Sequence, residues 1–203
     1  MKHPPSHPAK RARKPSSVRI IGGSHKRSLL PVLEAEGLRP TSDRVRETLF
    51  NWLGQDLRGW RCIDAFSGTG ALGFEAASRG AADVLLVEQN TKLALSLNAT
   101  ATRLKLAGVR VERGDGVLVL GREAGRKWDA VFLDPPFSQA SGDLFARALR
   151  ASRACLKPSG VCYLEAPLAW SPDALAALGW ALEKQGQAGA VYFHLLKPVS
   201  SDL

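Results

Sequence analysis

The feature that most constrains this chain is the regular alternation of short apolar runs and helical segments that begins near residue 61. Strands that alternate with helices are joined by crossovers, so they build a mostly parallel sheet with helices on both faces. We expect strands at 62–66, 84–87, 109–112, 131–133, 161–164, 180–182 and 191–196. These seven strands use the chain from residue 61 onward, so the sequence predicts a single α/β domain without room for a second catalytic domain.

The first residues have a different composition. Residues 1–17 contain four prolines and five basic side chains but no acid, so they cannot bury apolar surface and are predicted to be disordered. They supply more than half of the net charge of +9. A basic arm of this kind suits a phosphate backbone, although a solubilising tail would have the same composition.

Between this tail and the α/β region the sequence predicts a small extension. Two apolar runs, at 18–21 and 29–33, flank Gly22-Gly23 and favour a hairpin or loose ribbon with a basic tip. Ser42 or Asp43 can cap a helix that continues to about residue 53. The expected organisation is therefore a tail at 1–17, an extension at 18–57 and a catalytic domain at 58–198.

Several classes of protein are disfavoured by what the sequence lacks. It has no run of apolar residues close to the roughly 18 that a membrane helix needs, and no apolar segment follows its charged start as in a signal peptide. Its three cysteines, Cys62, Cys155 and Cys162, match no zinc spacing. We therefore expect a cytoplasmic protein, monomeric and without metal or membrane contact.

A glycine loop follows the first expected strand. Gly68, Gly70 and Gly73 match the G-x-G-x-x-G pattern of a dinucleotide site, which is a weak signal by itself. Asp64, at the end of the strand, would repel a pyrophosphate but suits a ligand with a cationic amino-acid end. S-adenosylmethionine carries an ammonium and a sulfonium and has no phosphate, so Asp64 favours it over a nicotinamide dinucleotide.

Two further acids extend this candidate site. Glu88 ends the second strand, where a carboxylate accepts hydrogen bonds from ribose hydroxyls of either cofactor. Asp115 follows the third strand and could accept from the adenine amino group, or could cap a helix. The predicted S-adenosylmethionine site consists of Asp64, Phe66, Gly68, Gly70, Glu88 and Asp115.

The most specific motif is Asp134-Pro135-Pro136-Phe137, at the end of the fourth strand. Paired prolines remove two backbone donors, which leaves a cluster of acceptors around the Asp134 carboxylate. An exocyclic amine supplies two donors, so such a cluster can orient it toward a methyl donor. Phe137 can stack on the base. The sequence therefore predicts amine methylation, with Asp134, Pro135 and Phe137 as catalytic residues.

These motifs resemble those of Rossmann-like class I methyltransferases, and two N-terminal segments, Arg19-Ile-Ile-Gly-Gly23 and the segment from Leu38 to Leu53, resemble the RsmD family in particular. The resemblance covers about residues 18–197. It implies methylation of the guanine N2 amine in 16S ribosomal RNA, at guanine 966, within a small-subunit assembly particle. It also implies that Thr41 and Asp43 border the cleft and that RNA contacts involve Lys26, Arg27, Arg39, Arg44 and Arg46.

The tip of the expected hairpin departs from the family pattern. The family usually has a basic residue, a glycine and another basic residue after Gly-Gly, whereas Lys26 is followed here by Arg27 and Ser28. The hairpin tip is still basic. Because of the departure, the family pattern does not predict the backbone conformation of the tip or which of its residues contact RNA.

Three other functions fit parts of the pattern. An adenine-N6 methyltransferase acting on DNA or RNA would use the same acceptor cluster, although reading a DNA duplex usually needs additional sequence. A dinucleotide-dependent oxidoreductase would explain the glycine loop but not Asp64 or Asp134. A non-enzymatic RNA-binding assembly factor would not need the intact acids Asp64, Glu88 and Asp134.

Overall fold

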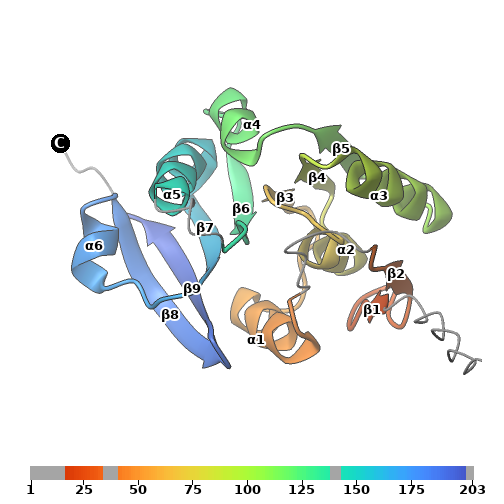
Figure 1. Ribbon diagram of the computed structural model, residues 1–203, viewed down its shortest axis with the longest axis horizontal. Coiled ribbons are helices and arrows are strands. Elements are labelled where there is room, and N and C mark those ends of the chain that lie inside the picture. The colour runs from red at the N-terminus through yellow and green to blue at the C-terminus, as the bar shows by residue number, and fades with distance from the viewer. Residues whose placement is uncertain (1–16, 34–40, 138–142, 200–203) are drawn as a thin grey trace, which may run out of the picture.

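The computed structural model describes residues 17–33, 41–137 and 143–199. Its strands are β1 Ser17–Arg19, β2 Leu29–Pro31, β3 Arg61–Asp64, β4 Asp83–Glu88, β5 Val109–Arg113, β6 Trp128–Leu133, β7 Leu156–Ala166, β8 Trp180–Ala188 and β9 Val191–Pro198. Its helices are α1 Asp43–Leu53, α2 Ala71–Ser78, α3 Thr91–Arg103, α4 Gly116–Arg122, α5 Leu144–Cys155 and α6 Pro172–Ala176 (Figure 1).

Seven strands form one sheet in the order β5-β4-β3-β6-β7-β9-β8. The strands from β5 to β7 are parallel, and β9 runs antiparallel to both β7 and β8. The predicted seven-stranded, mostly parallel sheet is confirmed. The chain runs outward from β3 to β4 and β5 and then returns to β6, so the strand order reverses between β3 and β6. Open α/β sheets form their ligand crevices at such a switch point.

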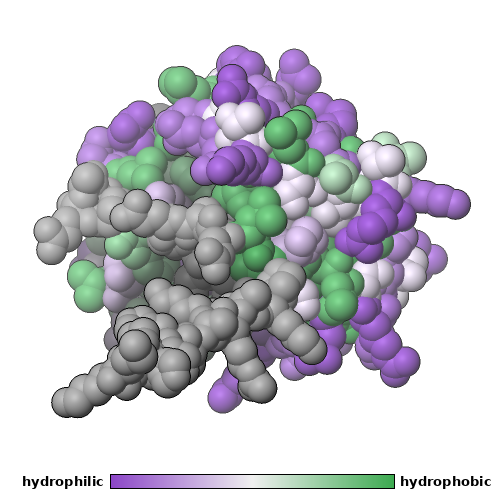
Figure 2. All heavy atoms as spheres, turned by 45° about the vertical axis from the view of Figure 1, so that its right-hand side comes forward, coloured by the Kyte–Doolittle hydropathy of each residue, from purple (hydrophilic) through white to green (hydrophobic). Residues whose placement is uncertain are grey.

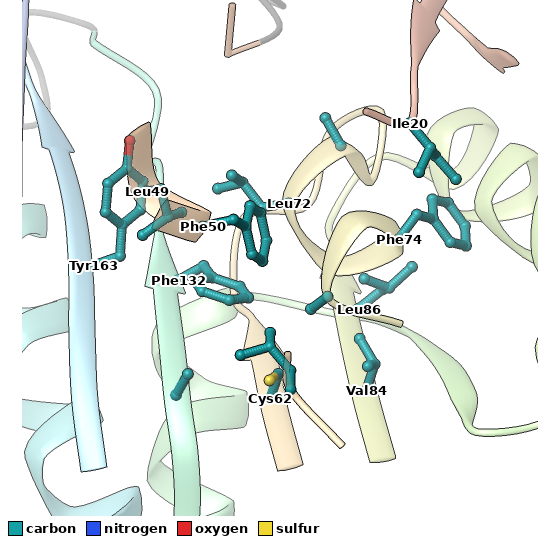
Figure 3. Close-up of a cluster of buried hydrophobic side chains, with 14 of the residues drawn as sticks. Ile20, Leu49, Phe50, Cys62, Leu72, Phe74, Val84, Leu86, Phe132 and Tyr163 are labelled. Atoms are coloured by element: carbon teal, nitrogen blue, oxygen red, sulfur yellow. The ribbon is translucent and has the colours of Figure 1, made fainter. Parts of the chain in front are cut away.

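The sheet has an apolar layer on each face. In β4, Val84 and Leu86 belong to the layer under α1, α2 and α3, whereas Leu85 and Val87 belong to the layer under α4, α5 and α6. The alternation follows from the period of two along a strand. In the first layer, the ring of Phe50 from α1 meets Phe132 from β6 edge-on, with ring centroids 6.2 Å apart (Figure 3).

The predicted N-terminal hairpin is present as the antiparallel pair β1 and β2, and it packs against α2 (Figure 1). The Ser24 N–H donates to the Ser78 carbonyl at 2.7 Å, and the Ser78 hydroxyl donates to the Gly22 carbonyl. A Cβ atom on Gly23, which has a φ of 73°, would lie 1.9 Å from the Ser78 carbonyl oxygen. The Gly-Gly pair is therefore explained by the close approach of the hairpin to α2.

The tip of the hairpin keeps a backbone conformation that favours glycine. Arg27 stands where the RsmD pattern has glycine, and its φ is 74°, in the left-handed region. The departure from the pattern thus changes the side chain but leaves a glycine-like backbone conformation in place.

A buried ionic cluster holds the hairpin, α1 and α2 together. One Glu75 oxygen accepts from the Ile21 N–H and the other from the Gly22 N–H, both at 2.8 Å. Arg46 lies 3.4 Å from the same carboxylate and Arg79 lies 2.9 Å from it. Arg46 and Glu75 are both fully buried. The carboxylate therefore satisfies two backbone donors and two guanidinium groups at once.

Three elements differ from the sequence prediction: β7, α4 and β8. Strand β7 begins at Leu156 rather than at residue 161. Helix α4 was not predicted, because its sequence Gly-Val-Leu-Val-Leu-Gly-Arg contains two glycines and two β-branched residues, which are poor helix formers. Strand β8 extends to Ala188 rather than ending at residue 182. It lies at the edge of the sheet, where polar side chains interrupt the apolar pattern that identifies buried strands.

On the face shown in Figure 2, hydrophilic side chains lie mainly along the margins and hydrophobic side chains gather in several areas between them. Within the described ranges, the helices are too short or too polar to cross a bilayer.

Candidate active site

A cleft of about 1170 Å³ lies along the carboxyl ends of the parallel strands. Each of the five parallel strands brings one acidic residue to its lining. In the spatial order of the strands from β5 to β7, these residues are Asp115, Glu88, Asp64, Asp134 and Glu165. The switch point falls between Asp64 and Asp134, so the cleft has a glycine-loop side and a proline-motif side.

The glycine loop connects β3 to α2 on the first side. Gly68 and Gly70 have φ values of 51° and 76°, which residues with a Cβ rarely adopt. A Cβ atom on Gly73 would lie 2.1 Å from Leu86, so the third glycine allows α2 to pack closely on β4. Gly68 and Gly70 are both predicted to bind the cofactor; Gly68 lines the cleft, whereas Gly70 does not and shapes the loop through its backbone conformation.

Asp64 lies at the floor of the cleft beneath this loop. It is 2% exposed, and its Oδ2 atom accepts the Gly73 N–H at 3.0 Å. Burial raises the pKa of the Asp64 carboxyl to about 7, and the hydrogen bond from Gly73 partly opposes this rise. The group can therefore gain or lose a proton near neutral pH when a charged ligand approaches.

Glu88 and Asp115 each hold part of the local backbone. The Gly68 N–H donates to one Glu88 oxygen at 2.9 Å and the Asn90 N–H donates to the other at 2.7 Å. One Asp115 oxygen accepts the Leu118 N–H at 3.0 Å, so Asp115 is the N-cap of α4. A carboxylate oxygen can accept more than one hydrogen bond, so these contacts leave capacity for ligand hydroxyls and amines. Phe66 also lines this part of the cleft.

Asp134 follows β6 on the other side of the switch point. The Thr41 hydroxyl, from the segment just before α1, donates to its Oδ2 atom at 3.4 Å. Burial raises the pKa of the Asp134 carboxyl well above its usual range, and the charges of Glu165 and Asp64 raise it further. Of the residues that follow, Pro135 is buried, whereas Phe137 is 44% exposed at the rim of the cleft.

Glu165 is a cleft residue that the sequence prediction missed. It is 4% exposed, lies near the end of β7, and accepts a hydrogen bond from the Tyr163 hydroxyl at 2.9 Å. The signal in the sequence was an acid directly after the apolar run 161–164, where an uncompensated charge would be costly.

Of the basic residues predicted to contact RNA, Lys26, Arg27, Arg44 and Arg46 lie outside the cleft lining. Lys26 and Arg27 are exposed at the hairpin tip, and Arg44 is exposed on α1. Arg39 lies outside the described residues. The prediction of a direct RNA contact is wrong for Arg46, because its side chain is fully buried and pairs with Asp43 at 2.7 Å as well as with Glu75. Within the described ranges, His, Cys, Asp and Glu side chains form no cluster suited to a metal ion.

Comparison with known proteins assigns the chain to a family. A family model described as "Conserved hypothetical protein 95" matches residues 18–197. Ribosomal RNA small subunit methyltransferase D from Escherichia coli strain K12 is 36% identical over 178 residues, which cover 88% of each chain. The chain belongs to the RsmD family.

Solved structures related to this RsmD family member share its architecture. A putative methyltransferase, yhhF, from Escherichia coli has a TM-score of 0.77 and 32% identity, covering 91% of this chain and 99% of its own. The Thermus thermophilus 16S rRNA N2 G1207 methyltransferase RsmC, solved with AdoMet and guanosine, has a TM-score of 0.71 and 25% identity. That match covers 92% of this chain and 50% of the RsmC chain. The Rossmann-like methyltransferase fold predicted from the sequence is thereby confirmed.

Proposed function

We propose that this protein transfers a methyl group from S-adenosylmethionine to the N2 amine of a guanine in small-subunit ribosomal RNA, by family resemblance guanine 966. The observation that carries the proposal is the position of Asp134. Its carboxylate is recessed in the cleft, at a strand end that is followed by two prolines. The glycine loop lies on the other side of the switch point. The names of the curated relatives and of the RsmC structure, which was solved with guanosine, support the choice of substrate.

The glycine-loop side of the cleft fits S-adenosylmethionine, which supplies an electrophilic methyl group on a sulfonium. Asp64 would face the ammonium end, Glu88 would accept from the ribose hydroxyls and Asp115 from the adenine amino group. The three acids stand at the end of β3, at the end of β4 and just after β5, in the order that an extended nucleoside with an amino-acid tail requires. Three acids and one basic residue, Lys92, line this side, so the lining suits a cationic ligand better than a pyrophosphate.

On the proline-motif side, Asp134 would accept a hydrogen bond from the target amine and fix its orientation. Its carboxylate would also stabilise the positive charge that develops on nitrogen. Because burial raises the pKa of Asp134, this group is a better proton acceptor than an ordinary carboxylate once the new bond has formed. Phe137, exposed at the rim, can stack on a base that has left its helix.

The RNA would approach the cleft over the N-terminal extension. Lys26, Arg27 and Arg44 are exposed there and can contact phosphates. Arg46 would act indirectly, by holding α1 and the hairpin in place. We propose a cytoplasmic, monomeric enzyme whose substrate is ribosomal RNA in a partly assembled small subunit, with residues 1–17 as an additional basic arm.

The test of the proposed function is methyl transfer from labelled S-adenosylmethionine to purified 16S RNA and to small-subunit particles, followed by nucleoside mapping. We expect N2-methylguanosine at one nucleotide. The same assay with adenine-containing DNA measures the alternative reaction. Label found in N6-methyladenine, or no incorporation into any ribosomal RNA substrate, would contradict the proposal.

Cofactor affinity should depend on pH through Asp64. Its pKa of about 7 means that the carboxyl of the free protein is largely protonated below that pH. A cationic ligand favours the carboxylate, so binding should release a proton below about pH 7, and affinity should rise as pH increases toward 7 and then level off. Calorimetry with the demethylated product, in buffers of different ionisation enthalpy, measures the released proton.

Asp64→Asn is the matched variant for this measurement. It keeps the shape of the side chain but cannot ionise, so both the proton release and the rise in affinity below pH 7 should disappear. An unchanged pH profile in this variant would show that another group controls the affinity.

A further inference from the structure

Glu165 lies near the carboxyl end of β7, the last of the five parallel strands in the sheet order, and the proposed function gives it no role. In the parallel pair β6 and β7, Leu133 lies opposite Leu164, so Asp134 and Glu165 occupy the next positions on adjacent strands. Both side chains line the same cleft. If the cofactor occupies the ends of β5, β4 and β3, the base must occupy the ends of β6 and β7, and Glu165 lies beside the amine that Asp134 holds.

Glu165 is also held in a rigid environment. Tyr163, two residues earlier on the same strand face, donates its hydroxyl to Oε1 at 2.9 Å. Burial and the Glu165 charge raise the pKa of Tyr163 well above its usual range, so the hydroxyl remains a donor. The Tyr163 ring meets Phe132 edge-on with centroids 6.5 Å apart, within the layer shown in Figure 3. A carboxylate whose side chain is held in place by such contacts can bind a substrate atom with little change in its own conformation.

Glu165 and Asp134 place two acids side by side in the cleft. Burial raises the pKa of Asp134, and Glu165 lies close enough for its charge to raise that pKa further. An apolar residue would fill a buried strand end without this repulsion, since burying like charges together is unfavourable. A substrate that presents hydrogen-bond donors to both acids would offset that cost.

Guanine presents such a set of donors. Its N2 amine is adjacent to the ring N1–H, so the two groups place three hydrogens along one edge. Adenine and cytosine each have an unprotonated ring nitrogen beside their amine, and that lone pair would face the carboxylate. We propose that Glu165 accepts the N1–H of the guanine whose N2 amine is held by Asp134, and thereby selects guanine among the bases.

This inference rests on the proposed function, and a base analogue tests it separately. 2-Aminopurine keeps the N2 amine but has an unprotonated N1. It is placed at the target nucleotide of the RNA, and kcat/KM for methylation is compared with that of the guanine RNA. The wild-type protein should prefer guanine by about 10²-fold or more, because the analogue presents the lone pair of N1 to the carboxylate in place of a hydrogen-bond donor.

Glu165→Gln is the informative variant. Its amide can donate to the N1 of 2-aminopurine, so activity on guanine should fall and the preference for guanine should shrink to a few-fold. Tyr163→Phe removes the supporting hydroxyl and should lower activity with the preference largely kept. Glu183→Gln, on β8 outside the cleft lining, is the matched control for loss of an acid, because Glu183 pairs with Lys197 on the surface.

The outcomes separate the two proposals. If Glu165→Gln keeps the full preference for guanine, Glu165 does not read N1 and the inference is wrong. If the wild-type protein methylates neither RNA, the proposed function itself fails. Should the Gln variant melt well below the wild type, Glu165→Asp takes its place: it keeps the charge, so it should be slower but still prefer guanine, and a lost preference would overturn the inference.

Discussion

Replacing Asp134 with alanine is expected to lower the rate of methyl transfer by about 10²- to 10³-fold, the usual cost of removing one preorganised group that stabilises a developing charge. The variant loses the acceptor that orients the amine and the group that takes up its proton. Cofactor affinity should be almost unchanged, because the cofactor residues lie across the switch point, at the carboxyl ends of β3, β4 and β5 and in the loops that follow them. Single-turnover methylation of the RNA at saturating cofactor measures the effect on the chemical step.

Two companion variants distinguish chemistry from local structure. Asp134→Asn keeps the shape and one acceptor, so its rate should fall between those of the wild type and the alanine variant. Thr41→Val removes the hydroxyl that donates to Asp134 at 3.4 Å and should have a smaller effect than either. A rate for Asp134→Ala within a few-fold of the wild type would mean that the proline motif is only a structural turn.

Much of the fold was predictable because it rests on local patterns. The buried strands β3, β4 and β6 appear in the sequence as apolar runs, and the loops between them carry the expected glycines and caps. Helix α4 and the outer half of β8 were not predictable in this way. The sequence offers Asp115 as a cap for α4, but the residues that follow are poor helix formers, so the helix depends on packing against its neighbours, and the outer half of β8 depends on pairing with β9.

The candidate site was predictable where an acid follows a recognisable strand. Asp64, Glu88 and Asp134 stand at the carboxyl ends of strands that the sequence identifies, and parallel pairing brings these ends to one edge. Glu165 stands at the same edge but was missed, because the sequence does not show that β7 lies next to β6. The role of Arg46 was predicted wrongly for a related reason: its partner Glu75 lies on α2, and no pattern within α1 indicates that contact.

Replacing Glu75 with leucine is expected to lower the free energy of unfolding by about 3–5 kcal/mol, the range measured when one partner of a buried ion pair is removed. Leucine would leave the buried Arg46 guanidinium without this carboxylate. It would also leave the Ile21 and Gly22 N–H groups, which donate to Glu75 at 2.8 Å, without their acceptor. Because those groups hold the hairpin to α2, RNA affinity should fall together with stability. Urea unfolding monitored by circular dichroism measures the change in free energy.

A surface pair and a double variant show whether burial is the cause. Glu183→Gln breaks the pair with Lys197, in which both side chains are more than a third exposed, and should change the stability by less than about 1 kcal/mol. Adding Arg46→Met to Glu75→Leu removes the stranded charge, so the double variant should be less destabilised than the sum of the two single variants. Additive losses would show that Arg46 and Glu75 contribute independently, and a loss below 1 kcal/mol for Glu75→Leu would show that the hairpin is held to α2 mainly by its apolar contacts.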